Sequence, residues 1–250
     1  MTTFSLRTMT YNIHKGFSAG NRRFVLQQIR EELRIADVDI VFLQEIQGQH
    51  LLHKAKLIDW PSESQFEYMA DKLWPHYAYG KNAIYNAGHH GNAILSKYPF
   101  IHWENLNVSS MRWASRSLLH GVVQIQEPPD KLHVICVHLD FMPGLRRRQI
   151  KILNERIREC VPQDEPLILA GDFNDWNGQV TRNLASNLEL HEVFHNLQGP
   201  RYRTASRAPS RARRRDRLRR ASGAAYYQSL YHCVHLFPPP QMLSAFFWVH

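Results

Sequence analysis

The chain has 250 residues, of which 44% are hydrophobic and 21% charged, with 12 Gly and 13 Pro. This composition excludes collagen, coiled coils and an entirely disordered chain, and the length suffices for one sizeable domain. The cysteines Cys136, Cys160 and Cys233 are odd in number and widely spaced. That pattern argues against a disulfide scaffold or a zinc ribbon and favours a reducing compartment.

The formal net charge of +9 is confined to one end of the chain. Residues 199–250 contain ten Arg, no Lys and one acidic residue, Asp216, whereas residues 1–198 contain 21 basic and 21 acidic residues. The net charge therefore does not indicate a nucleic-acid-binding surface on the larger part. The start of the chain has no signal-peptide pattern, and no apolar run approaches the roughly 18 residues of a membrane span. We expect a soluble, cytoplasmic protein with no membrane span.

Helices and strands follow one another irregularly along the first 198 residues. Near-alternation over residues 4–11 predicts a half-buried strand, helical spacing of apolar residues predicts a helix over 22–36, and the apolar run 39–43 predicts a buried strand. Further helices are predicted over 65–74 and 145–161, and further strands over 91–96, 118–125, 132–139 and 167–170. Since several strands are consecutive, an α+β fold of two packed sheets with helices outside fits better than a doubly wound parallel sheet.

Four of the predicted strands carry, at or near their ends, side chains suited to metal or phosphate chemistry. Asn12 follows the first strand and Glu45 the second, His138 lies in the strand over 132–139, and Asp172 and Asn174 follow the strand over 167–170. Carboxylate and amide oxygens are ligands that Mg²⁺ prefers, and histidine suits proton transfer. Each residue alone is more often a turn former or a packed histidine. Their coincidence favours metal-assisted phosphoester hydrolysis.

The motifs that carry these residues resemble a known family. TYNIH (10–14), VFLQE (41–45), GNAILSKYP (91–99), VHL (137–139) and GDFND (171–175) occur in this order, and Arg148 and Gln149 open a helix after VHL. The set is similar to the endonuclease/exonuclease/phosphatase family over about residues 5–198. The resemblance implies a four-layer α/β/β/α sandwich of the DNase I type with its site at one edge. It also implies Mg²⁺- or Mn²⁺-dependent hydrolysis of phosphodiester or phosphomonoester bonds.

The resemblance also implies a role for each of the five residues. Glu45 corresponds to the main metal ligand, and Asn12 to its neighbour, a ligand or an amide that positions the phosphate. Asp172 and Asn174 correspond to the pair that orients the attacking water and holds a phosphoryl oxygen. His138 corresponds to the histidine that stabilises the transition state or protonates the leaving oxygen.

Other residues are substrate-binding candidates. Asn92 in the GNAILS strand and Arg116 are the two that we select. Trp103 and Trp113, together with Arg112 and Arg116, either line a substrate groove, where rings stack on bases, or simply pack on a sheet face. Arg147 and Arg148 either reach a phosphate or form a solvated helix start. His89 and His90 lie at the rim of the predicted site, and the sequence leaves their role open.

The C-terminal segment departs from the family pattern. The family closes with a strand that carries an Asp-Arg pair and then a Ser-Asp-His run whose His is the general base, but no Asp-His dipeptide occurs after residue 198. Asp216, followed by Arg217, is a weak candidate for the Asp-Arg pair. The abrupt change in composition suggests a reading-frame shift near residues 200–203. We therefore predict a domain over 1–198 and an atypical tail over 199–250. If the frame shift holds, the final strands and the general base are missing, and loss of the base costs about 10²- to 10⁴-fold in rate.

Two alternatives to a nuclease remain. Within the same fold, the enzyme would be a lipid or inositol phosphate phosphatase, since the neutral first 198 residues disfavour a processive DNA-binding enzyme. In another class, the chain would be a catalytically impaired family member whose basic tail binds nucleic acid. No stable protein partner is expected from the sequence.

Overall fold

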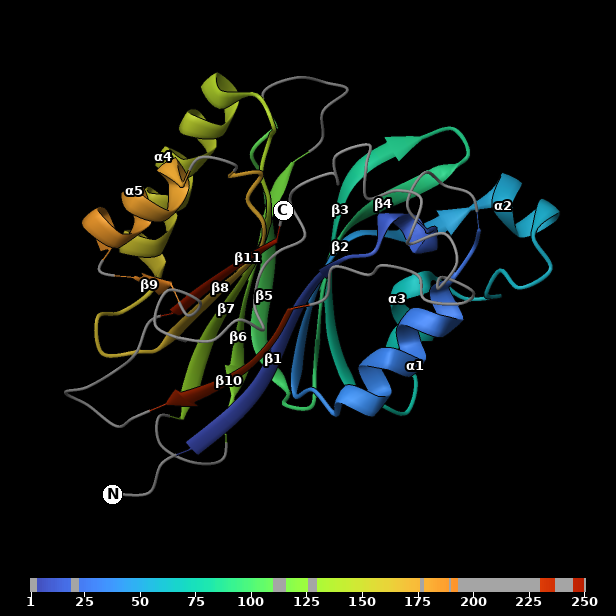
Figure 1. The fold of residues 1–250 in the computed structure, drawn as a ribbon, viewed down its shortest axis with the longest axis horizontal. Coiled ribbons are helices and arrows are strands. Elements are labelled where there is room, and N and C mark those ends of the chain that lie inside the picture. Colours follow the sequence, from blue (N-terminus) through green and yellow to red (C-terminus); the bar gives the residue numbers. More distant parts are fainter. Residues whose placement is uncertain are drawn as a thin grey trace, which may run out of the picture.

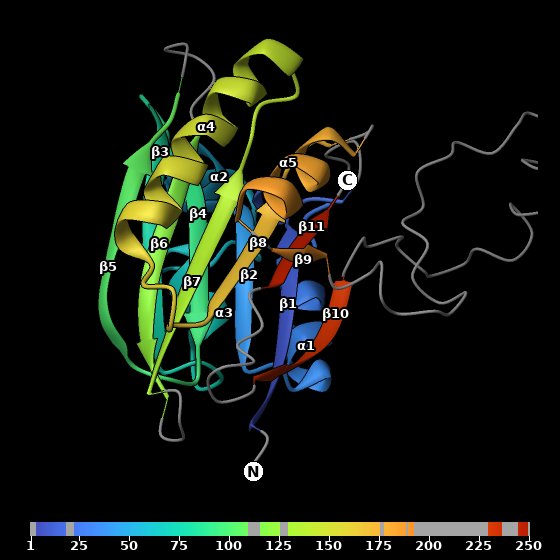
Figure 2. The ribbon, with the colours of Figure 1, turned by 90° about the vertical axis from the view of Figure 1, so that its left-hand side faces the viewer.

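A computed structural model of the chain describes residues 4–18, 23–109, 116–125, 130–175, 178–188, 190–192, 230–236 and 245–249. Within these residues the strands form two sheets that pack face to face, and helices cover the outer face of each sheet (Figure 1; Figure 2). The predicted four-layer α/β/β/α sandwich is thereby confirmed. None of the described helices is long and apolar enough to cross a membrane.

The first sheet has the strand order β10-β1-β2-β4-β3. Its strands are β1 (Phe4–Asn12), β2 (Ile40–His50), β3 (His76–Tyr85), β4 (Gly88–Ser96) and β10 (Leu230–Leu236). Strands β1 and β2 run parallel, joined by a short 3-10 helix, η1 (His14–Gly16), and by α1 (Leu26–Ala36). Two shorter helices, α2 (Leu51–Lys56) and α3 (Gln65–Ala70), follow β2.

The second sheet has the strand order β5-β6-β7-β8-β11-β9. Its strands are β5 (Phe100–Asn107), β6 (Ser117–Gln124), β7 (Lys131–His138), β8 (Leu167–Asp172), β9 (His191–Glu192) and β11 (Ala245–Val249). The long helix α4 (Pro143–Cys160) connects the parallel strands β7 and β8, and α5 (Gln179–Leu188) follows β8. Both helices lie on the outer face of this sheet (Figure 2).

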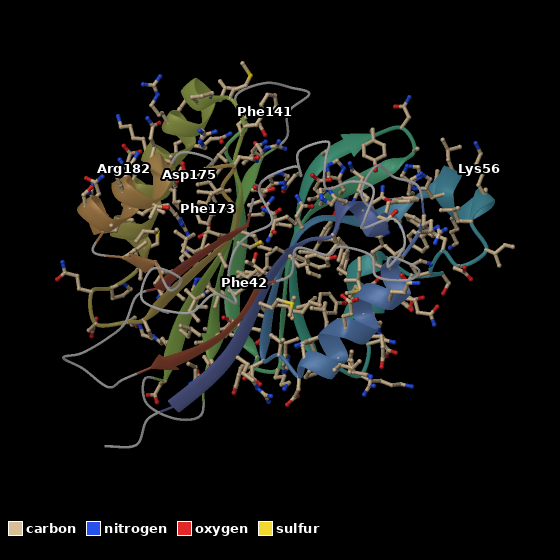
Figure 3. The ribbon with its side chains drawn as sticks, viewed as in Figure 1. Phe42, Lys56, Phe141, Phe173, Asp175 and Arg182 are labelled. Carbon is tan, nitrogen blue, oxygen red and sulfur yellow. The ribbon has the colours of Figure 1, made fainter. Side chains whose placement is uncertain are left out.

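Apolar side chains fill the three spaces between the four layers. Phe42, fully buried, lies between the two sheets (Figure 3). Ile29 and Leu33 of α1 pack with Leu43 beneath the first sheet, as the helical spacing predicted. The third cluster joins α4 and α5 to the second sheet. Burial of this kind stabilises a fold by roughly 25 cal/mol per Å² of apolar surface, so the sandwich provides a rigid support for its edge.

Most predicted elements are present, with shifted ends. The helix predicted over 22–36 begins at Leu26, and the strand predicted over 39–43 continues to His50. The sequence analysis did not identify β3, β5, α2 or α5. Strand β5 is an edge strand of largely exposed residues, so it lacks the alternation of apolar residues that marks a half-buried strand.

The C-terminal segment contributes two strands that the sequence did not predict. Strand β10 pairs antiparallel with β1, with Leu6 opposite Val234, and β11 pairs parallel with β8, with Ala170 opposite Phe247. The expectation that this segment lacks sheet strands is therefore wrong for these two stretches. Residues 193–229, which include all ten arginines of the C-terminal segment and Asp216, lie outside the described part of the chain.

Candidate active site

The predicted site residues Asn12, Glu45 and Asp172 come together at one edge of the sandwich, where the two sheets meet. The side-chain nitrogen of Asn12, Nδ2, lies 3.1 Å from Asp172 Oδ2 and 3.4 Å from Glu45 Oε1, and donates to both. Asn12 and Glu45 belong to the first sheet and Asp172 to the second, so one amide group bridges two carboxylates across the two sheets. The Asn12 carbonyl oxygen is used locally, because Oδ1 accepts the backbone N–H of His14 at 3.1 Å.

Glu45 reaches this edge through an irregularity inside β2, not through the end of the strand as predicted. The pairing of β2 with β4 shifts register between Leu43 and Ile46, and Glu45 has a φ of 55°, in the left-handed region. A bulge of this type re-aims a side chain while the strand continues beyond it. The apolar run ends at Leu43, which is why the sequence indicated an earlier end for the strand.

His138 and Asp172 face each other on neighbouring parallel strands. They are paired in register at the ends of β7 and β8, and His138 Nε2 lies 3.8 Å from Asp172 Oδ2. Gly171 permits this close approach: its φ is 145°, and a Cβ there would lie 2.0 Å from the carbonyl oxygen of Val137. Only glycine adopts this backbone without a clash, so the Gly of GDFND is required for the pair.

The rest of GDFND shapes the loop after β8. The Asn174 N–H donates to Asp172 Oδ1 at 3.0 Å, and the Asn174 side chain donates to the carbonyl oxygen of Leu139 at 2.9 Å. Asn174 therefore ties the loop after β8 to the loop after β7. Asp175 is buried and caps α5, accepting the backbone N–H groups of Gln179, Val180 and Thr181 (Figure 3). Asp172 thus faces the site, whereas Asp175 caps a helix.

A lysine and a histidine lie beside Glu45. Lys15 Nζ lies 3.4 Å and His14 Nδ1 3.9 Å from Glu45 Oε2. Burial by itself raises the pKa of Glu45, but His138, Lys15, His14 and the Asn12 hydrogen bond together lower it to about 2. Glu45 is therefore an anion at neutral pH and offers a charged oxygen ligand.

Two imidazoles at the site are held neutral. Burial lowers the pKa of His138, and the charge of Arg116 lowers it further, against the opposing effects of Asp172 and Glu45. Burial, with the nearby charge of Lys15, lowers the pKa of His90 to about 4. His90 Nδ1 is buried without a hydrogen-bond partner among the described residues. A neutral imidazole both accepts and donates a hydrogen bond, which suits proton transfer.

The donor set fits a hard divalent cation. Two carboxylates converge on one amide group, and Mg²⁺ in proteins is often held by one or two carboxylates together with water and substrate phosphate. Within the described residues no group of three or more His, Cys, Asp or Glu side chains could hold a metal ion by itself. Glu45 and Asp172 are the carboxylates at this edge that could take part in holding a cation.

The remaining candidates are distributed differently. Asn92 is fully buried and donates to the carbonyl oxygen of Ser117 at 3.2 Å, while its Oδ1 has no hydrogen-bond partner in the described part of the chain. Arg116 directly precedes Ser117 and acts electrostatically on His138 and His90. Arg147 and Arg148 are exposed near the start of α4, as a solvated helix start requires.

Five of the candidates cannot be assigned to the site. Trp103 is 46% exposed on the edge strand β5. Arg112, Trp113 and Asp216 lie outside the described residues. His89 is hydrogen-bonded through Nδ1 to the hydroxyl of Tyr79 at 2.9 Å, which gives it a packing role.

The sequence analysis missed two residues that organise the site. Lys15 lies just past the TYNIH motif and contacts Glu45. Gln65, the first residue of α3, is fully buried, donates to the carbonyl oxygen of Lys15 at 2.8 Å and accepts the N–H of Gln47 at 3.0 Å. The HKG sequence after TYNI was a signal for Lys15, but nothing in the sequence pointed to Gln65, which lies 50 residues away.

Comparisons with known proteins identify the family of the chain. The chain matches the model of the endonuclease/exonuclease/phosphatase family over residues 9–230. It is 42% identical over 201 residues to an uncharacterized protein, YbhP of Escherichia coli strain K12, with 80% of this chain and 79% of YbhP covered.

Several solved structures share the fold. An endonuclease/exonuclease/phosphatase family protein from Bacteroides thetaiotaomicron is similar with a TM-score of 0.56 and 19% identity, covering 74% of this chain and 70% of that one. A second, from Beutenbergia cavernae, has a TM-score of 0.53 and 22% identity. The match covers 68% of this chain and 47% of that one. D. rerio TDP2, in a complex with a single-strand DNA product, has a TM-score of 0.51 and 20% identity. The match covers 71% of this chain and 64% of that one.

Proposed function

Because this chain belongs to the endonuclease/exonuclease/phosphatase family, as its motifs predicted, we propose that it is a metal-dependent phosphoesterase whose site is built on Glu45 and Asp172. The family is one of hydrolases that act on phosphoester bonds. The observation that carries the proposal is the convergence of Asn12, Glu45, His138 and Asp172 from four strands in two sheets.

In this proposal Glu45 and Asp172 hold a Mg²⁺ or Mn²⁺ ion. The ion, when bound, neutralises negative charge that develops on the phosphoryl group and the leaving oxygen. Asn12 keeps the two carboxylates at a fixed separation through its NH₂ group. Asn92 and Arg116 remain the candidates for contact with the substrate, and Arg116 brings a positive charge that acts on His138 and His90.

Asp172 and His138 are the groups that handle protons. The Asn174 N–H fixes one oxygen of Asp172, Oδ1, while the other faces both Asn12 and His138. Asp172 orients the attacking water, and neutral His138 accepts its proton or hydrogen-bonds a phosphoryl oxygen. In this proposal the pair of Asp172 and His138 activates the water.

The test is hydrolysis by conservative variants. Glu45→Gln and Asp172→Asn keep the size of each side chain but remove its charge, and we expect each to lower metal-dependent turnover by at least about 100-fold. Glu159→Gln, at an exposed position on α4, is the matched control and should retain full activity. Turnover that survives in both site variants, or that needs no divalent ion, would overturn the proposal.

The alternative, an impaired member whose basic segment binds nucleic acid, makes a different prediction. Deleting residues 199–250 would remove β10 and β11 from the two sheets, so the suitable test is charge removal in Arg211–Arg220. Loss of DNA binding in that variant, without any effect of Glu45→Gln on binding, would favour the alternative. Resequencing the gene across codons 190–250 tests the proposed frame shift directly, because a second frame would contain an Asp-Arg strand followed by Asp-His.

A further inference from the structure

Lys15 has an unusual backbone conformation directly beside the proposed metal site. His14 and Lys15 have φ values of 46° and 59°, so two consecutive non-glycine residues lie in the left-handed region. Such residues are uncommon, and the conformation persists only where surrounding structure holds it. Strain of this kind at a site edge indicates that the position of the side chain matters.

A buried amide holds this conformation. Gln65 donates to the carbonyl oxygen of Lys15 at 2.8 Å and accepts the N–H of Gln47 at 3.0 Å. Gln47 lies two residues beyond Glu45 on β2. One side chain therefore fixes the backbone of Lys15 relative to the strand that carries Glu45, and the Lys15 ammonium group lies 3.4 Å from Glu45 Oε2.

The charges around the site match a doubly charged anion. Among the acidic and basic side chains, Glu45 and Asp172 contribute two formal negative charges, while Lys15 and Arg116 contribute two formal positive charges. The protein groups thus cancel, and a bound divalent cation leaves an excess of two positive charges. A phosphomonoester carries close to two negative charges at neutral pH, whereas a phosphodiester carries one.

We propose that Lys15 binds the phosphoryl group of the substrate and gives the site a preference for phosphomonoesters over phosphodiesters. This inference rests on the proposed function and names the substrate class for it. The Lys15 side chain is 39% exposed, so its ammonium group is accessible to a substrate phosphate. Charge-assisted hydrogen bonds from a fixed cation to a phosphate are among the stronger polar interactions in proteins.

The distribution of charge over the chain agrees with a small substrate. A nucleic acid needs a track of cations that follows many phosphates, and residues 1–198 have equal numbers of acidic and basic residues. A single terminal phosphate requires only the local cations. Lys15 supplies one cation 3.4 Å from Glu45, and the charge of Arg116 acts on His138 and His90.

The experiment compares Lys15→Met with Lys72→Met. Lys72 is an exposed lysine with the same φ of 59°, so its replacement controls for loss of a charge from a left-handed backbone position. Each protein is assayed with para-nitrophenyl phosphate and with bis(para-nitrophenyl) phosphate in the presence of Mn²⁺. The affinity for inorganic phosphate is measured by calorimetry, and Mn²⁺ affinity by electron paramagnetic resonance.

We expect Lys15→Met to lower kcat/KM for the monoester by about 10- to 100-fold, the range of a lost charged hydrogen bond, and to weaken phosphate binding by a similar factor. The loss for the diester should be less than about threefold, and Mn²⁺ affinity should stay the same or rise. Lys15→Arg should restore part of the monoester activity. Equal losses on both substrates, or unchanged phosphate affinity, would contradict the inference.

The outcomes also separate this inference from the proposed function. A wild-type enzyme that hydrolyses both substrates with Mn²⁺ but prefers the diester would refute the monoester preference and leave the proposed function intact. A protein that hydrolyses neither substrate would refute the proposed function for this chain. In that case unchanged phosphate binding by Lys15→Met would refute the assignment of Lys15 as well.

Discussion

Asn12 and Asp172 are 160 residues apart in the chain, yet Asn12 Nδ2 donates to Asp172 Oδ2 at 3.1 Å. The same nitrogen donates to Glu45 at 3.4 Å, so the amide separates two carboxylates that would otherwise repel each other. Because β1 and β8 belong to different sheets, this contact also fixes the edges of the two sheets relative to each other.

Replacement of Asn12 by Asp tests this arrangement. Asn12→Asp has the same shape but places a third carboxylate between two others, and we expect a loss of about 1–3 kcal/mol in the free energy of unfolding without metal. Mn²⁺ should then stabilise the variant more than it stabilises the wild type. Thermal unfolding at several Mn²⁺ concentrations measures both effects, and identical curves for the two proteins would argue against the bridging role.

Removal of the Gln65 amide should loosen the site more than the fold. Gln65→Leu leaves the Lys15 carbonyl oxygen and the Gln47 N–H without their partner, at a cost of about 1–3 kcal/mol. We expect a weaker Mn²⁺ affinity and a lower kcat in addition to the lower stability. Gln124→Leu, which removes an amide bonded to the carbonyl oxygen of Asp130 on the far sheet, is the control. If both variants show the same kinetics, Gln65 has a structural role only.

Asp172 and Asp175 lie three residues apart in one motif and should respond differently to substitution. Asp175→Ala removes the cap of α5, and we expect a loss of about 1–2 kcal/mol in stability with normal turnover per folded molecule. Asp172→Asn should abolish turnover with a much smaller effect on stability. Urea unfolding and initial rates on the same preparations separate the two roles; loss of turnover in well-folded Asp175→Ala would show that the cap also positions the site.

The sequence predicted two packed sheets with helices outside because burial patterns are local, and the family resemblance implied the four-layer sandwich. The runs around Phe42 and Ile168 are apolar on both faces, and the spacing of Ile29 and Leu33 gives one buried helix face. Such apolar runs and helical spacings depend only on residues close in sequence. The order of the family motifs then indicated Glu45 and Asp172 as candidate site residues.

The sequence could not predict how these residues are held. Glu45 lies on a bulge whose position depends on the pairing of β2 with β4, and Gln65 acts across 50 residues. Both are consequences of tertiary packing and leave no periodic signal. The same holds for β10 and β11, whose pairing partners lie far away along the chain.

A buried hydrogen-bonded row beneath α4 should make stability depend on pH. His120 Nε2 lies 2.9 Å from His133 Nδ1, and His133 Nε2 lies 2.7 Å from Glu165 Oε2. Arg156, which also forms an ion pair with Glu104, approaches His120 Nδ1 at 3.4 Å. An arginine donates only, so it suits a neutral His120 that accepts at Nδ1 and donates at Nε2.

Burial lowers the pKa of His120 to about 4, from an ordinary value near 6.5, and lowers the pKa of His133 as well. Because the folded state binds fewer protons than the unfolded state between these values, stability is fully present above pH 6.5 and falls as the pH drops toward 4. The shift for His120 corresponds to about 3 kcal/mol over that window. Chemical denaturation at pH 7 and pH 5 should show the decline, and His120→Gln should reduce its slope. A wild-type protein equally stable at both pH values would mean that His120 keeps an ordinary pKa in the fold.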